Sequence, residues 1–324
     1  MIKQISSLIF LLTWFIYVSY ICLLPAVIFQ KDAIISPIIK DVFSSLISSG
    51  LKYGFQPKMY YTNKIEQSNK VDIIIANHIS TIDTNIILTF LNYCGITNYI
   101  LVGKKELMYL PGFGFHFMTD NHIKLSRNWD KDEHSLHQQI EKINNGVIII
   151  FPEGTRFEPD KLKTGQKFSL ENDLPVYNNL LVPKSKGLWT IFNELKKRNK
   201  MGKLYDMTIV MQKFLGKAAY LTDLITKETG NVFIINREIQ PINYSEHSDF
   251  KNYLLKEWKK KDELINIYNK IVYEKMEIPD NKLYIFYSIL FIISITYGLK
   301  KPENRFYFIG TILLSYMMTF SKKF

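Results

Sequence analysis

Short apolar runs alternate along the chain with longer segments of helical periodicity, and this pattern predicts an α/β fold. Runs of strand length stand at Val71–Ala76, Tyr99–Val102, Val147–Phe151, Leu180–Pro183, Tyr205–Met211 and Val232–Arg237. Helical periodicity is found at Ile82–Tyr93, Asp132–Asn144, Leu188–Lys197 and Phe250–Lys275. Strands that alternate with helices are typical of a mostly parallel central sheet that is flanked by helices on both faces.

The segment Ile34–Leu51 has a wide apolar stripe of its own. Its apolar residues recur every four positions in two neighbouring rows, and the polar residues opposite are Lys40, Asp41, Ser44, Ser45 and Ser48. This is the pattern of a helix with one apolar face. Two interpretations fit it equally: a helix that packs against the protein core, or a helix that lies in a membrane interface.

Three further apolar segments predict an integral membrane protein. Ile5–Leu24 is almost free of charge and as a helix would be about 30 Å long, which is enough to cross a bilayer core. A cleaved signal peptide is the alternative, but the run is long for one and no convincing Ala-x-Ala site follows. Leu283–Leu299 and Phe306–Phe320 are shorter and predict a hydrophobic hairpin, complete or re-entrant, with buried core helices as the alternative.

These segments divide the chain into three parts. Residues 1–51 form the predicted N-terminal membrane anchor and amphipathic helix, residues 52–276 a globular catalytic domain, and residues 277–324 the C-terminal membrane hairpin. No internal repeat or low-complexity linker interrupts residues 52–276, so we expect a single domain there. We expect this basic domain to face the cytosol, on the endoplasmic reticulum or a similar internal membrane.

Charge narrows the choice of partners. The chain has 41 Lys and Arg against 30 Asp and Glu, a net charge of +11, which suits an anionic partner such as phospholipid headgroups or coenzyme A phosphates. The basic run Lys251–Lys261 is broken by acidic residues and lies in no recognised nucleic-acid module, so we expect no nucleic-acid partner. It is interpreted as a solvated helix face or as a membrane-surface contact. With 2 Cys and no His at ligand spacing, we expect no metal.

The polar residues after the run Val71–Ala76 are the best candidates for catalysis. Neutral His accepts a proton near physiological pH, so His78 could be a general base, and a carboxylate on its far ring nitrogen would fix the tautomer. Asp83 can supply that carboxylate only if His78 lies in a turn and Asp83 in the first helical turn. Ser80-Thr81-Ile82-Asp83 has the pattern of a capping box and allows this. In the alternative, Asp83 only caps the helix and His78 is a polar core residue.

A second polar motif, Glu153-Gly154-Thr155-Arg156, follows the run Val147–Phe151. Gly154 lets backbone amides approach a ligand closely, and Arg156 offers a planar fork for a phosphate. Glu153 could accept hydrogen bonds from substrate hydroxyls or orient Arg156. Arg127, after a short apolar alternation, would reach the same sheet edge and hold a second phosphate oxygen. The alternatives are an ordinary turn at Glu153 and a surface salt bridge at Arg127.

Four motifs occur in an order that resembles the glycerolipid acyltransferase family of the plsC type. They are Asn77-His78-Ile79-Ser80 with Asp83, Ile123–Arg127, Phe151–Arg156 and Leu181–Gly187. The chain is most similar to the 1-acyl-glycerol-phosphate and lysocardiolipin acyltransferases, through Arg127-Asn128-Trp129 and the helix around Trp258. Asp120-Asn121-His122 and Lys184 depart from the family pattern, and these departures bear on the identity of the substrate.

The resemblance implies a membrane-bound enzyme that moves a fatty acyl chain from acyl-CoA to a lysophospholipid hydroxyl, for example that of lysophosphatidate. It implies no cofactor, since acyl-CoA is a co-substrate. His78 would be the general base and Asp83 its partner, and the substrate-binding residues would be Arg127, Glu153, Gly154, Thr155 and Arg156. The alternatives are a lysocardiolipin or lysophosphatidylinositol acceptor, a membrane-bound thioesterase that uses the same pair, and a non-enzymatic tether.

Overall fold

The computed structural model describes residues 40, 43–45, 47–109, 113–119, 122–126, 128–240 and 244–279. An eight-stranded sheet lies at its centre, with the strand order β4-β3-β5-β2-β6-β7-β1-β8. The strands are β1 (Lys58–Tyr61), β2 (Val71–Ala76), β3 (Tyr99–Lys104), β4 (Ile123–Leu125), β5 (Gly146–Ile150), β6 (Met201–Met211), β7 (Asn231–Ile239) and β8 (Glu274–Met276).

The half of the sheet that carries the predicted motifs is parallel. Five consecutive strands, β4, β3, β5, β2 and β6, are parallel to one another. In contrast, β6 pairs with β7 and β1 pairs with β8 in antiparallel fashion. The sheet as a whole is therefore mixed, which refines the prediction of a mostly parallel one. Because parallel strands end at the same edge, the residues after β2, β4 and β5 reach one side of the sheet.

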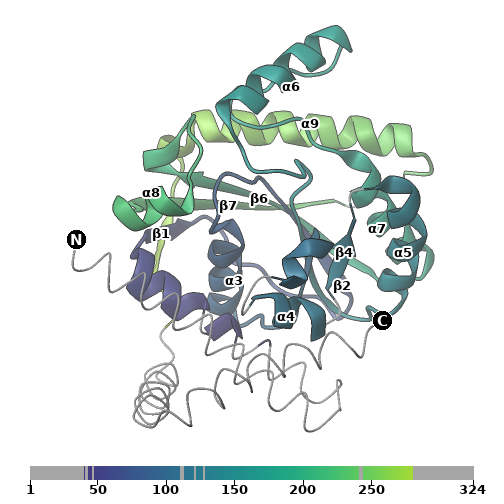
Figure 1. Cartoon of the computed structure of the whole chain (residues 1–324), viewed down its shortest axis with the longest axis horizontal. Coiled ribbons are helices and arrows are strands. Elements are labelled where there is room, and N and C mark those ends of the chain that lie inside the picture. Colours follow the sequence, from purple (N-terminus) through teal and green to yellow (C-terminus); the bar gives the residue numbers. More distant parts are fainter. Residues whose placement is uncertain are drawn as a thin grey trace, which may run out of the picture.

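Helices cover both faces of the sheet (Figure 1). The helices are α3 (Asp83–Tyr93), α4 (Phe113–Thr119), α5 (Trp129–Glu141), α6 (Pro159–Glu171), α7 (Ser185–Lys197), α8 (Leu221–Thr226) and α9 (His247–Asn266). Residues of β2 alternate between two hydrophobic cores, with Ile74 facing the core of α3 and Ile73 and Ile75 facing that of α5, α7 and α9. Every residue of β2 is buried, because both faces are covered.

The element predictions failed at two places. Leu180–Pro183 forms no strand, because this segment is a loop whose polar groups pair outside the sheet: the indole of Trp258 donates to the Leu181 carbonyl at 3.0 Å. Helix α9 ends at Asn266, well before the predicted end at Lys275, and the chain then turns into the edge strand β8. The short strands β1 and β8 and the 13-residue helix α6 were not predicted.

The described part of Ile34–Leu51 is helical and packs against the domain. Phe43, Ile47 and Leu51 belong to the core on the α3 face. The polar side is also covered, since Lys40 Nζ donates to Asn98 Oδ1 at 2.9 Å and the Asn92 amide donates to Ser48 at 3.1 Å. These contacts favour the interpretation of this segment as a core-packed helix.

The predicted membrane segments lie outside the described residues. Ile5–Leu24, Leu283–Leu299 and Phe306–Phe320 all belong to parts of the chain that the structure does not describe. Within the described ranges, none of the helices has the length and apolar character needed to cross a bilayer. The predicted anchor and hairpin therefore stay predictions.

Candidate active site

The loop after β2 brings His78 and Asp83 into direct contact. His78 Nδ1 lies 2.8 Å from Asp83 Oδ2, and the exposed fractions of the two side chains are 23% and 0%. His78 lies in the loop and Asp83 is the first residue of α3, which is the placement that the sequence required. An ionised carboxylate can only accept, so Nδ1 carries the proton and Nε2 is left as the proton acceptor.

The Asp83 carboxylate also organises the loop around it. It accepts hydrogen bonds from the backbone amides of Ile79 at 2.6 Å and Ser80 at 2.8 Å, and from the Ser80 hydroxyl. The Ser80 hydroxyl oxygen in turn accepts from the Ile82 amide at 3.2 Å. The bond that the Ser80 amide donates to Asp83 resembles a capping-box contact, but the N-cap residue of α3 is Ile82, and it makes no side-chain cap hydrogen bond. Asp83, as the first residue of α3, therefore holds the loop of His78 rather than capping the helix.

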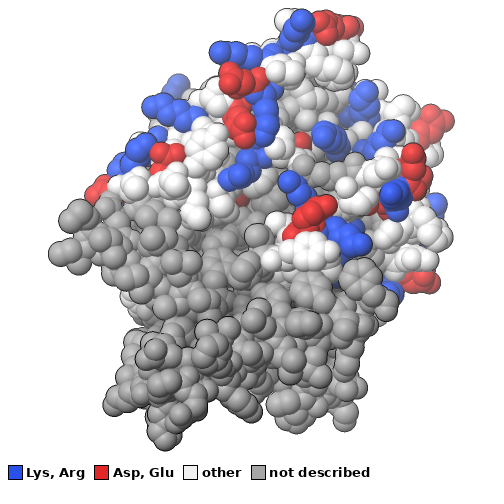
Figure 2. All heavy atoms as spheres, in the orientation of Figure 1, with Lys and Arg blue, Asp and Glu red and all other residues white. Residues whose placement is uncertain are grey.

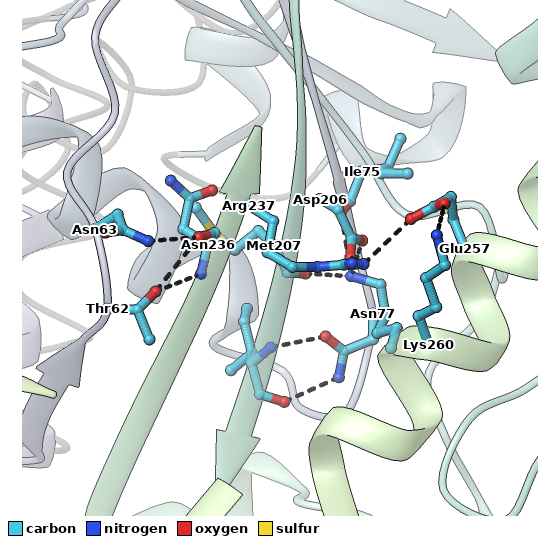
Figure 3. A network of polar contacts seen from close by, with 12 residues as sticks. Thr62, Asn63, Ile75, Asn77, Asp206, Met207, Asn236, Arg237, Glu257 and Lys260 are labelled. Atoms are coloured by element: carbon cyan, nitrogen blue, oxygen red, sulfur yellow. Dashed lines mark hydrogen bonds and ion pairs between the residues drawn. The ribbon is translucent and has the colours of Figure 1, made fainter. Parts of the chain in front are cut away.

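Residues on either side of His78 fix the direction of the loop. The Asn77 side chain continues the sheet hydrogen bonding, because its amide donates to Ile209 O at 2.9 Å and its oxygen accepts from Ile209 N at 2.8 Å (Figure 3). The His78 ring stacks on Phe151 with their centroids 4.5 Å apart. The His78 carbonyl accepts from the Phe157 amide at 2.7 Å. The first and third motifs are therefore joined directly.

Gly154 and Lys184 bring the fourth motif to the same place. Gly154 has a φ of +67°, a conformation that favours glycine, and a Cβ atom at this position would lie 3.6 Å from Lys184 Nζ. The Lys184 amide donates to Pro152 O at 2.8 Å. The sequence placed Lys184 in the fourth motif without predicting this contact, because Lys184 and Gly154 are 30 residues apart and leave no local signal of it.

Arg156 lies beside the His78–Asp83 loop. Its guanidinium donates to Thr81 Oγ1 at 2.5 Å, and this contact was not expected from the sequence. Thr155 is half-buried, and its hydroxyl accepts from Lys161 at 2.9 Å, so α6 holds it in place. Arg127 lies outside the described residues. The structure thus brings His78, Asp83, Gly154 and Arg156 together and adds Lys184 and Thr81 to them.

Glu153 occupies a different position from the one expected. Its exposed fraction is only 2%, and its carboxylate accepts from the His78 backbone amide at 3.4 Å. Burial raises the pKa of Glu153 well above its usual value, while hydrogen bonds from the His78 and Leu181 amides and the charge of Lys261 act in the opposite direction. A side chain buried in this way supports the loop of His78 and has little surface to offer a substrate.

A buried ion pair lies beneath the loop. Lys261 Nζ on α9 is 2.6 Å from Asp206 Oδ1 on β6 and donates to the Met207 and Ile75 carbonyls at 2.5 Å and 3.4 Å. Arg237 also contacts Asp206 and reaches Glu257 at 3.3 Å (Figure 3). The expectation that Lys251–Lys261 is a solvated face fails at Lys261, which is fully buried, because the helix turns this position toward the sheet.

Comparison with known proteins shows that this chain is similar to acyltransferases. Residues 58–212 match the family model described as "Acyltransferase". A 1-acyl-sn-glycerol-3-phosphate acyltransferase 2 from Brassica napus is 32% identical over 147 residues, which are 44% of this chain and 37% of the relative. A probable 1-acyl-sn-glycerol-3-phosphate acyltransferase 5 from Arabidopsis thaliana is 30% identical over 200 residues, 60% of this chain and 52% of the relative.

A more distant relative and a solved structure also match the chain. A 2-acyl-1-lysophosphatidylinositol acyltransferase from Saccharomyces cerevisiae is 24% identical over 217 residues, covering 53% of this chain and 54% of the relative. The crystal structure of the 1-acyl-sn-glycerophosphate acyltransferase PlsC from Thermotoga maritima has a TM-score of 0.55 at 15% identity, over 81% of this chain and 95% of that one. The chain thus spans about a third to a half of the length of the curated relatives that it matches.

Proposed function

We propose that this chain, which belongs to the plsC-type glycerolipid acyltransferase family, transfers a fatty acyl group from acyl-CoA to a lysophospholipid hydroxyl. The contact between His78 and Asp83 carries the proposal. It supplies a general base whose tautomer is fixed, with a guanidinium beside it for an acceptor phosphate. The family relatives carry names of enzymes that act on acyl glycerophosphates or lysophosphatidylinositol.

The proposed reaction is direct transfer without an acyl-enzyme. His78 Nε2 removes the proton from the acceptor hydroxyl while the hydroxyl oxygen attacks the thioester carbonyl carbon. A C–O bond forms, the C–S bond breaks, and the thiolate leaves with the proton that His78 returns. The products are the acylated phospholipid and the free thiol. The negative charge of Asp83 stabilises the imidazolium that forms in between.

Binding and alignment account for the rest of the proposed rate enhancement. General base catalysis supplies about 10²- to 10⁴-fold, and the alignment of two bound substrates about 7–11 kcal/mol. Arg156 at the loop of Thr81 and Lys184 beside Gly154 are the cations that we assign to the acceptor phosphate. Figure 2 shows Lys and Arg side chains, with Asp and Glu among them, spread over the described part of this face.

We also propose that the enzyme acts while bound to a membrane. Residues 52–276 are the proposed catalytic domain, and residues 1–51 and 277–324 hold the apolar segments that would anchor it. A lysophospholipid is itself a membrane component, so an anchored domain meets its acceptor at the bilayer surface. Retention of the full chain in the membrane fraction after alkaline washing tests this part, and its release into the supernatant would contradict it.

An acceptor panel tests the reaction. The full chain in detergent receives oleoyl-CoA with glycerol-3-phosphate, lysophosphatidate, lysophosphatidylinositol or monolysocardiolipin, and release of free thiol is followed over time. We expect acceptor-dependent release, with lysophosphatidate as the preferred acceptor, and loss of this release in His78→Ala. Release at the same rate without any acceptor would show a thioesterase instead. Release from no combination would contradict the proposed function altogether.

A further inference from the structure

The side of the domain next to the active site carries an open groove between α5 and α7. Its volume is about 370 Å³, and its lining includes Trp129, Glu133, Lys186, Trp189, Lys197 and His247. The two helices lie side by side in Figure 1, and the first turn of α9 contributes His247. None of these residues takes part in the chemistry assigned to His78. The groove therefore needs an account of its own.

Aromatic rings and cations face each other in this groove. Lys186 Nζ lies over the Trp129 ring, 5.8 Å from its centroid. Trp189 packs on Phe250 with centroids 5.3 Å apart and on His247 with centroids 6.1 Å apart, so its ring is held in place from below. Both tryptophans are only half-buried. The groove thus offers flat apolar surfaces together with the positive charge of Lys186, and Lys197 at its edge also pairs with Glu194 at 3.2 Å.

The start of α7 links the groove to the active site along the chain. Lys184, which contacts Gly154, immediately precedes the first helical residue, Ser185. The Ser185 hydroxyl lies 2.9 Å from His247 Nε2, so the first turn of α7 is fixed against α9. Trp129 opens α5, the helix that follows β4, and parallel strands place this end of the helix at the same sheet edge as His78.

We propose that this groove binds the adenosine 3′,5′-diphosphate end of the acyl-CoA donor, an inference that rests on the proposed function. A purine ring stacks on aromatic side chains, and Lys is a common phosphate ligand. The carboxylate of Glu133 can accept a hydrogen bond from the exocyclic amino group of adenine. The pantetheine arm then passes Lys184 and Gly154, and this path brings the thioester to His78.

A bare phosphate or a lipid headgroup explains less of the groove. Either would use Lys186 and Lys197, but neither has a planar ring to match Trp129 and Trp189. A tryptophan pair can also lie at a membrane interface. A membrane contact, however, would not require the two rings to lie in one groove with the cations beside the start of α7. The nucleotide end of coenzyme A uses both features at once.

The test compares two donors that share the thioester and differ at the nucleotide end. Oleoyl-CoA and oleoyl-pantetheine carry the same thioester, but the second lacks the adenosine 3′,5′-diphosphate and the phosphate that joins it to the pantetheine. In the full-length enzyme we expect Trp129→Ala and Lys186→Met each to raise the KM for oleoyl-CoA by about tenfold. Their KM for oleoyl-pantetheine should equal that of the wild type. Lys167→Met, on α6, is the matched control because Lys167 is exposed and outside the groove, and it should change neither value.

A binding measurement that needs no turnover accompanies the kinetics. Titration with adenosine 3′,5′-diphosphate should quench tryptophan fluorescence in the wild type and Lys167→Met, and Lys186→Met should weaken the affinity by about tenfold. Quenching that persists in a preparation without acyl transfer would show that the proposed function failed while the nucleotide site stands.

Three outcomes would overturn the groove assignment. A KM that rises equally for both donors would mean that the groove only supports the fold. A KM for oleoyl-CoA that stays at the wild-type value in both variants would mean that the nucleotide binds elsewhere. Reduced binding of Lys186→Met to phosphatidylserine vesicles, with the donor KM unchanged, would identify the groove as a membrane contact.

Discussion

Two polar pairs lie close together at the end of β2 and differ in their access to water. His78 and Asp83 are 2.8 Å apart, and Lys261 and Asp206 are 2.6 Å apart. The imidazole has an exposed fraction of 23%, whereas both side chains of the second pair have 0%. Loop amides surround Asp83, but strand carbonyls surround Lys261. The contacts have similar lengths, and their surroundings differ completely.

This difference separates a pair that can react from a pair that holds the fold. A proton on His78 can exchange with a substrate, because one side of the ring reaches the surface. Lys261 has no such access, and its charge is balanced within the protein by Asp206. A buried pair of this kind contributes little net stability, but removal of one partner leaves a costly unpaired charge. Contact distance alone therefore does not identify a catalytic pair.

Loss of the imidazole should give the largest effect on activity. We expect His78→Ala to lower kcat by about 10² to 10⁴-fold, because the general base is gone. The urea midpoint of unfolding should stay close to that of the wild type, since the ring is partly exposed and Asp83 keeps its amide hydrogen bonds. Initial rates of thiol release and urea titrations measure the two quantities. If His78→Ala instead lowered the urea midpoint and kept the wild-type kcat, His78 would have a structural role like that of Lys261 and Asp206.

Loss of the buried ammonium should give the reverse pattern. We expect Lys261→Met to lower the free energy of unfolding by about 1–3 kcal/mol, because Asp206 then keeps only Arg237 as a partner and the buried Met207 carbonyl loses its donor. Lys260→Met is the matched control, since the Lys260 ammonium is 57% exposed and its partner Glu257 keeps a second contact with Arg237. That change should cost less than about 1 kcal/mol. Chemical denaturation measures the free energy of unfolding of both variants. Equal losses of this free energy would contradict the structural role of Lys261.

The pH dependence of stability should sharpen the comparison at Glu153, which lies between the two pairs. Its raised pKa means that the folded protein keeps a proton that the unfolded chain releases. Its contribution to stability is therefore present below the ordinary pKa of 4.5 and is lost as the pH rises toward the folded-state pKa. The wild type should lose up to about 1.4 kcal/mol per pH unit in that window relative to Glu153→Gln.

Urea titrations of the wild type and Glu153→Gln at several pH values above 4.5 measure this difference. Parallel stability curves for the two proteins would show that Glu153 is ionised in the folded state. Its carboxylate would then belong with the charges around Lys261.

The smallest expected effect concerns two glycines, and it distinguishes the cost of backbone strain from a contribution to substrate binding. Gly154 and Gly216 share a φ of +67°, but only Gly154 lies against Lys184, since nothing lies within 4 Å of a Cβ at Gly216. Alanine at either position should cost about 1 kcal/mol of stability, because L-residues disfavour this conformation. Only Gly154→Ala should also raise the KM for the acceptor. Thermal unfolding measures the loss of stability, and acceptor kinetics measure the KM. An equal KM for the acceptor in the two variants would show that Gly154 does not contribute to the substrate site.

Much of the local structure followed from the sequence. The boundaries of β2 and the start of α3 agree closely with the prediction, because the apolar run and the capping pattern are local signals. The contact between His78 and Asp83 also followed, since it spans only a short loop. By contrast, Leu180–Pro183 has the composition of a strand and forms none. Its carbonyl pairs with Trp258, and that partner is distant in the sequence.

The sequence by itself determined the α/β fold, the order of the motifs and the placement of His78 next to Asp83. All of these depend on periodicity and spacing over a few residues. Only the tertiary structure decided that Glu153 and Lys261 are buried, that Lys184 reaches Gly154, and that two tryptophans share a groove with Lys186. Burial depends on what packs against a side chain, and the partners here come from strands and helices that are far apart along the chain.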